Sequence, residues 1–313
     1  MLIAELKQNA GVEGTVTGLL TEVHVSQNSF GNRWMDLALT DKSGSTTLKM
    51  WAEALENNAD PEAMVGKIIS ASGMADLWQD RGTLNVVKIQ EAENASLRDV
   101  FPALAEEEAA QCKEALANLI DQVSDASIKK LLQTIFSPKR LEKVSEKTGG
   151  TNHHVFLGGL LLHLVQTAKI SLAGANTAGP YAKPVNEDYV IAGALLHDIG
   201  KLTTLSDEPG KLSDRGFCID AGTESVLYVT MYNNKLGEDK VSNLATLNHI
   251  ILSCHNGGPR TLEAIIVSNA DCLDTQVDSF GLAFTGNTKN GGKIAYSKKM
   301  GAYMFREGSG ETE

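Results

Sequence analysis

Apolar and polar residues alternate with a period near two in the first third of the chain, and with a helical period after it. The alternation predicts β-strands, and a short helical stretch at 52–58 interrupts them. A helix before the fourth of five strands is typical of the OB-fold, a small Greek-key barrel. A five-stranded SH3-like barrel is the alternative, and the position of the helix favours the OB-fold. The predicted strands are 14–25, 33–40, 45–51, 67–74 and 83–89.

From residue 105 onward, apolar residues recur three and four positions apart, as on one face of a helix. Two segments rich in Gly, Pro, Asp or Ser, 174–185 and 203–221, predict loops. The predicted helices after residue 150 are 153–173, 186–197, 222–235, 240–255 and 260–278. We therefore expect a multi-domain α+β protein, with a barrel at 1–92, a helical linker at 93–150, an all-α domain at 151–278 and a basic C-terminal extension at 279–313.

Composition narrows the class of protein. An apolar fraction of 42% and a charged fraction of 21% are typical of a soluble globular chain, and no apolar run is long enough to cross a membrane. The N-terminus lacks the pattern of a signal peptide. Four cysteines without Cys-x-x-Cys spacing predict free thiols in a reducing compartment, so we expect a cytoplasmic protein without a membrane partner.

Charge bears on nucleic-acid binding in two ways. A net charge of −11 argues against broad electrostatic capture of nucleic acid, and the barrel segment itself is acidic. Residues 279–306, in contrast, carry five basic and no acidic residues, with aromatic residues among them. Lys298 and Lys299 are therefore candidate phosphate contacts, although the segment could equally be a solvated extension that packs its aromatics on the domain.

Aromatic residues in the barrel form a candidate platform for stacking bases. The candidates are Phe30, Trp34, Trp51 and Trp78, with Arg81 as a cation beside them. The alternative is that at least two of these rings lie in the core of the barrel.

His197-Asp198 closes the apolar run Ala194-Leu195-Leu196 and precedes Gly200-Lys201. Imidazole and carboxylate ligands suit divalent metals of the Mn, Fe or Mg type, and such a metal activates water for attack on phosphorus. With His163 and Asp271, this pair would supply four ligands from three helices. Taken singly, His163 could be a core histidine and Asp271 could cap a turn. The order of all four residues along the chain favours a role as metal ligands.

Two further residues complete the candidate site. Lys201 lies about one turn after His197 and could neutralise a scissile phosphate, or be solvated at the helix end. His255, before Asn256-Gly257-Gly258, could bind the metal or donate a proton to a leaving oxygen.

The order His163, His197-Asp198, Asp271 resembles the HD superfamily of metal-dependent phosphohydrolases. The whole chain resembles the YhaM family of bacterial 3′→5′ exoribonucleases, through Asp41-Lys42-Ser43-Gly44, Asn152-His153-His154, Leu196–Lys201 and His249–Ser253. This resemblance implies a phosphodiesterase, typically supported by Mn²⁺ with Mg²⁺, Fe²⁺ or Co²⁺ as alternatives. It would trim single-stranded RNA, and DNA as a further substrate, and release nucleoside 5′-monophosphates. Asp198, Lys201 and His255 would act in catalysis, and His154 would contact the nucleic acid.

Two positions depart from the family pattern. Glu224 and Cys254 stand where the family tends to have histidines, and both positions, with His255, would serve a second metal. One metal, altered metal choice or weakened activity could follow. A phosphohydrolase acting on free or cyclic nucleotides and a non-catalytic nucleic-acid-binding protein are the alternative functions, and a homo-oligomer is compatible with either.

Overall fold

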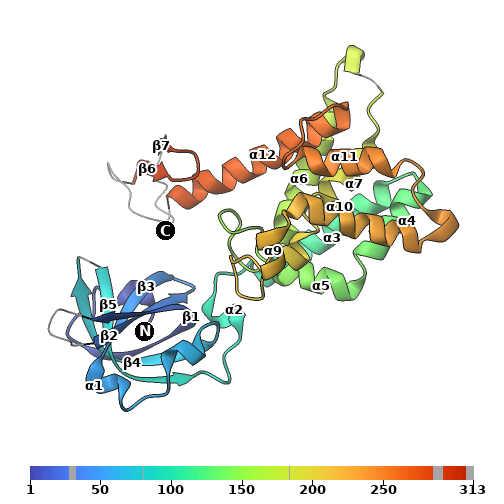
Figure 1. The fold of residues 1–313 in the computed structure, drawn as a ribbon. Helices are drawn as coiled ribbons and strands as arrows, with labels where there is room; N and C mark the ends of the chain where they lie inside the picture. The colour runs from blue at the N-terminus through green and yellow to red at the C-terminus, as the bar shows by residue number, and fades with distance from the viewer. Residues whose placement is uncertain (28–32, 80, 183, 285–291, 308–313) are drawn as a thin grey trace. The chain divides into compact units, whose positions relative to one another are not determined.

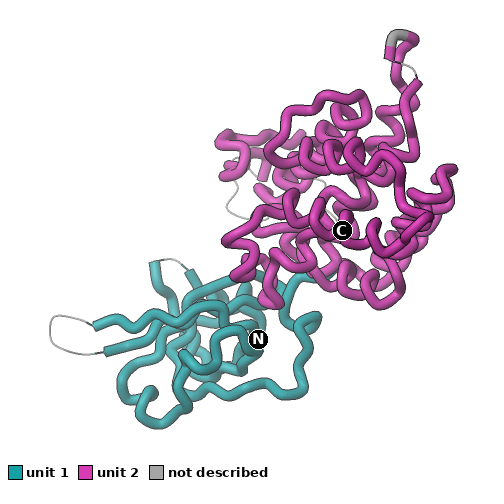
Figure 2. Tube along the Cα trace, turned by 45° about the vertical axis from the view of Figure 1, so that its right-hand side comes forward, with its two compact units in different colours: residues 1–103 teal, residues 104–313 magenta. Residues whose placement is uncertain are grey.

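The computed structural model describes residues 1–27, 33–79, 81–182, 184–284 and 292–307. The chain divides into two compact units, Met1–Ala103 and Leu104–Glu313 (Figure 2). The first is a closed barrel and the second is mainly helical (Figure 1), so the predicted multi-domain α+β class is confirmed. Within the described ranges, no helix combines the length and apolar character needed to cross a bilayer.

The barrel has the strand order β1-β2-β3-β5-β4, closed by pairing of β4 with β1. Neighbouring strands are antiparallel except for β3 and β5, which are parallel. This order, with the short helix α1 (Ala52–Leu55) before β4, is that of the OB-fold, so that prediction is confirmed over the SH3-like alternative. The strands are β1 (Glu13–Gln27), β2 (Arg33–Asp41), β3 (Gly44–Trp51), β4 (Ile68–Trp78) and β5 (Arg81–Glu91).

The two-residue period decides which side chains fill the barrel. Leu37, Leu39, Leu48 and Met50 are fully buried on β2 and β3. Their alternate neighbours on the same strands therefore face outward, and Trp34 and Trp51 of the predicted platform belong to that outer set. Phe30 lies outside the described residues.

The second unit is built around α6 and α7, against which α12 packs. Residues 104–150, expected to be a linker, form α3 to α5 and bury Leu116, Leu131 and Ile135 in the same core. The helices are α3 (Glu106–Gln122), α4 (Ala126–Ile135), α5 (Pro138–Glu146), α6 (Gly159–Asn176), α7 (Glu187–Leu196), α8 (Lys201–Thr204), α9 (Asp214–Cys218), α10 (Ala221–Lys235), α11 (Leu244–Ser253) and α12 (Leu262–Ala283). A hairpin of β6 (Ile294–Ser297) and β7 (Ala302–Phe305) follows α12, and a four-residue helix α2 (Leu97–Val100) ends the first unit.

The helix predicted at 153–173 begins later, at Gly159. His154 has a φ of 47° and Gly158 a φ of 87°, so the chain turns through left-handed backbone immediately before α6. A side chain on Gly159 would approach the His154 carbonyl oxygen to 2.1 Å, so the loop packs tightly on the helix start. His154 therefore lies in a loop and not in a helix.

Candidate metal centre

The four predicted metal ligands lie together in the second unit. His163 lies on α6, His197 caps the C-terminal end of α7, Asp198 follows it, and Asp271 lies midway along α12. Both histidines are fully buried and Asp198 is 2% exposed. The apolar residues of α6 and α7 pack these helices in the core, which holds the ligands in place.

Donor atoms of His163, His197 and Asp271 lie within 4.8 Å of one another, and Asp198 Oδ2 lies close to both histidine Nε2 atoms. His163 Nε2 lies 3.0 Å from His197 Nε2, 3.2 Å from Asp198 Oδ2 and 3.3 Å from Asp271 Oδ1. His197 Nε2 lies 3.3 Å from Asp198 Oδ2 and 3.6 Å from Asp271 Oδ1. Ligands about 2.1 Å from a metal lie about 3.0 Å apart at right angles and about 3.4 Å apart in a tetrahedron. The observed spacing therefore fits a single ion.

Hydrogen bonds on the far side of each imidazole orient the two Nε2 atoms. His163 Nδ1 donates to Asp274 Oδ2 at 2.6 Å, and His197 Nδ1 donates to the Ala194 carbonyl oxygen at 2.8 Å. With both Nδ1 atoms protonated, each neutral ring directs a lone pair at the other. Two lone pairs 3.0 Å apart repel unless a cation lies between them. Asp198 Oδ1, moreover, is buried without a hydrogen-bond partner. The donor set therefore fits a divalent metal.

Without a metal, protons occupy this cluster. Burial acts to lower the pKa of His163, but hydrogen bonds to Asp198, Asp271 and Asp274 outweigh it and raise the pKa to about 10. Burial likewise opposes the raised pKa of His197, where the charges of Asp198 and Asp271 lift it to about 9. Burial also acts against ionised Asp198, yet the charges of Lys201 and His197 hold its pKa well below the usual range. A metal must therefore displace protons from the histidines to bind.

Lys201 is engaged inside the protein and does not face solvent. Its ammonium lies 2.5 Å from Asp198 Oδ2, donates to the Gly149 carbonyl oxygen and lies 3.4 Å from His153 Nε2. Burial and the Lys201 charge lower the pKa of His153 to about 2, so that ring is neutral and can accept a hydrogen bond. An ammonium has three donors, so Lys201 holds Asp198 and the loop before α6 instead of offering a free charge to a phosphate.

The two positions expected to differ from the family, Glu224 and Cys254, have hydrogen-bond partners of their own in the second unit. Glu224 accepts two hydrogen bonds from Arg215, at 2.7 and 2.8 Å, and one from Thr203. Its carboxylate is thus satisfied by an ion pair, which corrects the expectation that it joins the metal site. Burial first, and then the charges of Asp271 and Asp198, raise the pKa of the Cys254 thiol, which keeps it protonated.

His255 lies at the rim of the cluster. Its Nε2 donates to the His197 carbonyl oxygen at 3.2 Å and lies 3.5 Å from Asp198 Oδ1. The side chain is 20% exposed, so it is accessible from solvent while remaining next to the Asp198 carboxylate.

The sequence did not reveal the positions of Asp274 and His154, which lie on the side of His163 away from the cluster. Asp274 lies one helical turn after Asp271 on α12 and is 5% exposed. His154 is 3% exposed, and its Nε2 lies 3.5 Å from Asp274 Oδ2. It therefore lies behind His163 and does not reach a surface where nucleic acid could bind, which corrects that expectation. The three-residue spacing of Asp271 and Asp274 on a predicted helix was the signal that could have found Asp274.

Replacing Asp274 by alanine is expected to weaken metal binding by about 10- to 100-fold, because the hydrogen bond that orients a metal-ligating histidine is lost. Asp274→Asn is the matched control, since its amide oxygen can still accept from His163 Nδ1 and should retain most of the affinity. Isothermal titration calorimetry with Mn²⁺ measures the metal affinity of the wild type and of both variants. Equal affinity in all three proteins would show that Asp274 does not orient His163.

The hairpin after α12 brings basic residues near the cluster. Burial and the Lys201 ammonium lower the pKa of Lys299, in the turn between β6 and β7, while Asp271 and Asp278 oppose that effect. Lys298 is exposed. Of these two predicted phosphate contacts, Lys299 is the one that lies within electrostatic reach of Asp271.

On the barrel, three tryptophans surround one lysine on the outer surface. Lys49 Nζ lies 5.6, 6.0 and 4.5 Å from the ring centroids of Trp34, Trp51 and Trp78, and 3.2 Å from Asp36 Oδ1. Trp51 is 46% and Trp78 56% exposed. Arg81 pairs with Trp78 across the β4–β5 hairpin and is exposed. The predicted rings that the structure describes thus form an outer-surface cluster.

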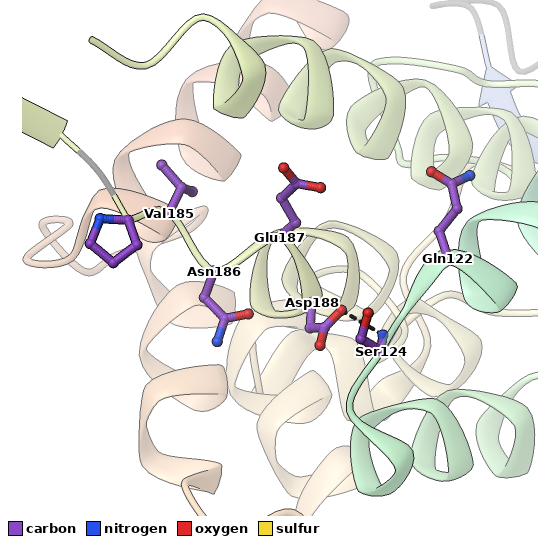
Figure 3. Close-up of a pocket in the computed structure, with 7 residues that line it drawn as sticks. Gln122, Ser124, Val185, Asn186, Glu187 and Asp188 are labelled. Carbon is purple, nitrogen blue, oxygen red and sulfur yellow. Dashed lines mark hydrogen bonds between the residues drawn. The ribbon is translucent and has the colours of Figure 1, made fainter. Parts of the chain in front are cut away.

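A separate hollow of about 410 Å³ in the second unit is lined by none of the predicted site residues. Asp188 lies in it and accepts the backbone N–H groups of Ser124 and Asp125 at 2.8 Å, as Figure 3 shows for Ser124. The carboxylate thus links α7 to the turn between α3 and α4, and the hollow has a structural explanation.

Comparison with known proteins adds four matches. The HD domain family matches residues 160–276, which include all four converging ligands. The 3′-5′ exoribonuclease YhaM of Oceanobacillus iheyensis is 26% identical over 283 residues, 85% of this chain and 84% of that protein. YhaM of Listeria monocytogenes serotype 4b is 24% identical over 277 residues, 80% of this chain and 81% of that one. Among solved structures, the second OB-fold domain of replication protein A from Methanococcus maripaludis matches 28% of this chain and 90% of its own, with 18% identity and a TM-score of 0.22.

Proposed function

We propose that this chain, whose resemblance to the YhaM exoribonucleases is confirmed by these matches, is a metal-dependent 3′→5′ exonuclease of single-stranded RNA. The carrying observation is the convergence of His163, His197 and Asp271 within the matched HD domain, with Asp198 Oδ2 within 3.3 Å of both histidine Nε2 atoms. Four donor atoms at metal-ligand spacing, in a domain of phosphohydrolase type, support hydrolysis of a phosphodiester.

Different residues of the chain would have different roles in such a reaction. A bound divalent metal would supply an activated water and offset charge on the phosphate. Asp271 is the most accessible of the four ligands, with a side chain 17% exposed, so substrate would approach from its side. His255 carries a proton at Nε2 beside Asp198 and is placed to donate it to the leaving oxygen. Lys299 is the cation available to a phosphate there, because Lys201 is already engaged.

The barrel would hold the strand that the metal centre shortens. Trp34, Trp51 and Trp78 present flat rings around the Lys49 ammonium, and stacking on such rings tolerates any base. Asp36 offsets the lysine charge, so binding here would depend on stacking more than on phosphate attraction. That balance is compatible with the acidic net charge of −11.

Replacing Trp78 by alanine is expected to cost ~1–3 kcal/mol of single-strand binding, the contribution of one stacked base, which raises the Kd about 5- to 150-fold. Fluorescence anisotropy with a labelled oligonucleotide, under metal-free conditions that prevent cleavage, measures the change. Val87→Ala is the matched control, because Val87 is 67% exposed on β5 of the same barrel. A Kd that Trp78→Ala leaves unchanged would remove the stacking role.

Several finer properties belong to this proposal. Mn²⁺ is the proposed metal, because the imidazoles of His163 and His197 with the carboxylates of Asp271 and Asp198 form a mixed nitrogen and oxygen set that suits it. Single-stranded DNA is a second substrate, since stacking does not read the 2′-hydroxyl. All four cysteines are free, which supports a cytoplasmic location.

Substrate discrimination tests the proposal. The protein is incubated with Mn²⁺ and a single-stranded RNA carrying a free 3′ end, the same RNA closed into a circle, free nucleotides and a cyclic dinucleotide. Mononucleotide release from the linear RNA alone is the expected result. Turnover of free or cyclic nucleotides without loss of RNA would indicate a nucleotide phosphohydrolase, and binding without turnover across several metals would indicate a binding protein.

A further inference from the structure

The hairpin of β6 and β7 exposes three aromatic side chains. Tyr296, Tyr303 and Phe305 are 49%, 62% and 59% exposed. Tyr296 pairs with Tyr303 across the hairpin, and their ring centroids lie 5.2 Å apart with the rings edge to face. The sequence left open that the aromatic residues of this segment pack on the domain, and the exposure of these three contradicts that alternative. Exposed flat rings are surfaces on which unpaired bases stack.

The other face of the hairpin joins it to α12, the helix that carries the proposed metal ligand Asp271. Ala295 and Ser297 alternate with the aromatic positions of β6 and are only 1% and 3% exposed. β6 packs against α12, and the hairpin follows the end of that helix (Figure 1). The Arg306 guanidinium lies 4.6 Å from the ring centroid of Phe284, the residue that caps α12. The hairpin is thus fixed to α12 through one face and presents its aromatic residues on the other.

The charge of the hairpin is opposite to that of the whole chain. The chain has a net charge of −11, whereas residues 292–306 contain Lys293, Lys298, Lys299 and Arg306 and no carboxylate. Within the part of the chain that the structure describes, no carboxylate forms an ion pair with any of the three lysines. A basic surface without carboxylates on an acidic protein attracts an anionic partner to that surface and away from the rest of the molecule.

The turn of the hairpin lies close to the candidate metal centre. Burial and the Lys201 ammonium lower the pKa of Lys299, and the charge of Asp271 opposes them. The pKa of His153 is lowered to about 2 by burial first, and Lys299 is one of the cations that contribute. The His153 ring centroid in turn lies 5.4 Å from that of His163. Lys299 is therefore near residues of the centre on α12 and in the loop before α6.

We propose that the hairpin of β6 and β7 binds the 3′-terminal nucleotides of a single strand, with bases on Tyr296, Tyr303 and Phe305 and phosphates beside the lysines. This inference rests on the proposed function, because its occupant is the strand that the metal centre would shorten. Flat rings suit bases, and lysines suit the phosphates between them. The hairpin also lies on the side of Asp271, from which substrate would approach.

An anionic membrane is the other partner that basic and aromatic side chains could attract. A membrane surface could not bring a phosphodiester to His163 and His197, which are fully buried, whereas the flexible end of a single strand could. The position of the hairpin beside the candidate centre therefore favours the strand.

Photo-cross-linking of the full chain locates the strand. A single-stranded RNA carries 5-bromouridine at its 3′-terminal or its 5′-terminal nucleotide and is irradiated with the protein in EDTA, which prevents cleavage. The 3′ label should cross-link to the peptide that contains Tyr296 and Tyr303, and the 5′ label should not. A 3′ label that cross-links only outside residues 292–307 would overturn the proposal, whether or not the protein is a nuclease. Phosphatidylserine vesicles that displace the RNA from this peptide as well as unlabelled RNA does would overturn it too.

Kinetics separate this inference from the nuclease proposal. Tyr303→Leu and Phe305→Leu each remove a flat ring and should raise the KM for RNA about 5- to 150-fold, the effect of one lost stacked base, with kcat nearly unchanged. Tyr303→Phe keeps the ring and its contact with Tyr296 and should retain the wild-type KM. Leu227→Ala, at a leucine 49% exposed on α10, is the matched control.

The two proposals fail in different ways. An active protein whose KM is unchanged in both leucine variants would overturn the role of the hairpin and leave the nuclease proposal intact. In a protein that releases no mononucleotide, the Kd for RNA by fluorescence anisotropy replaces the KM. A Kd raised about 5-fold or more in Tyr303→Leu and Phe305→Leu would then support the hairpin as the binding surface, and an unchanged Kd would overturn it.

Discussion

Replacing His197 by alanine is expected to abolish metal binding at micromolar Mn²⁺ and to lower kcat/KM on RNA by about 10³-fold or more. Its Nε2 lies within 3.6 Å of donor atoms from His163, Asp198 and Asp271. The substitution therefore removes the imidazole ligand at the centre of the cluster. A catalytic metal contributes several kcal/mol to stabilising the transition state. Since about 1.4 kcal/mol corresponds to a tenfold change in rate, the loss reaches about three decades.

Metal content by mass spectrometry and initial rates on RNA measure this effect. Asp271→Asn serves as a second variant, because it removes a charged ligand with little change of shape at a side chain that is already 17% exposed. His249→Ala is the matched control, since His249 lies in the same unit but accepts the backbone N–H of Arg260 outside the cluster. A His197→Ala protein that keeps both its metal and its activity would exclude the assigned site.

Replacing Lys201 by methionine is expected to lower the stability of the metal-free protein by ~3–5 kcal/mol, the usual cost of removing one partner of a buried ion pair. Lys201 is 8% and Asp198 2% exposed, and their charged atoms lie 2.5 Å apart. Thermal unfolding should shift downward by roughly 10 °C for a unit of this size. Mn²⁺ should restore part of the loss, because a bound metal would again neutralise Asp198.

The exposed pair of Lys130 and Asp239 provides the comparison for Lys201. Its side chains are 53% and 60% exposed, so Lys130→Met should cost less than ~1 kcal/mol. Calorimetry with and without Mn²⁺ distinguishes the two variants. If Lys201→Met unfolded at the wild-type temperature but showed a raised KM for RNA, Lys201 would contact the substrate and not hold Asp198.

The sequence was sufficient to predict features that depend on local patterns. Alternation along β2 and β3 identified the barrel strands, because inward positions such as Leu37 and Leu48 must be apolar to fill its core. The ligands His163, His197, Asp198 and Asp271 were predicted from their order along helical stretches, which resembles the HD superfamily, and His197-Asp198 also closes an apolar run. Helices α6, α7 and α12 were expected because apolar residues recur along them at helical spacing.

Features that depend on contacts between distant segments could not be predicted. Arg215 and Glu224 pair through a loop that folds back on α10, so the sequence could not show that Glu224 is already satisfied. Lys201 is held by Gly149 and His153, about fifty residues earlier, and the sequence alone indicated only its proximity to His197. The apolar face of α3 was visible in the sequence, but its packing on α6 depends on contacts between distant segments, so residues 93–150 were expected to be a helical linker.

The most direct test of the central claim is a time course with 5′-labelled single-stranded RNA and Mn²⁺. Wild type, wild type with EDTA, and the double variant His197→Ala/Asp198→Ala are compared. A ladder that shortens from the 3′ end, with mononucleotide product, is expected in the first reaction only. Intact RNA in the wild-type reaction, or equal degradation by the double variant, would contradict the central claim.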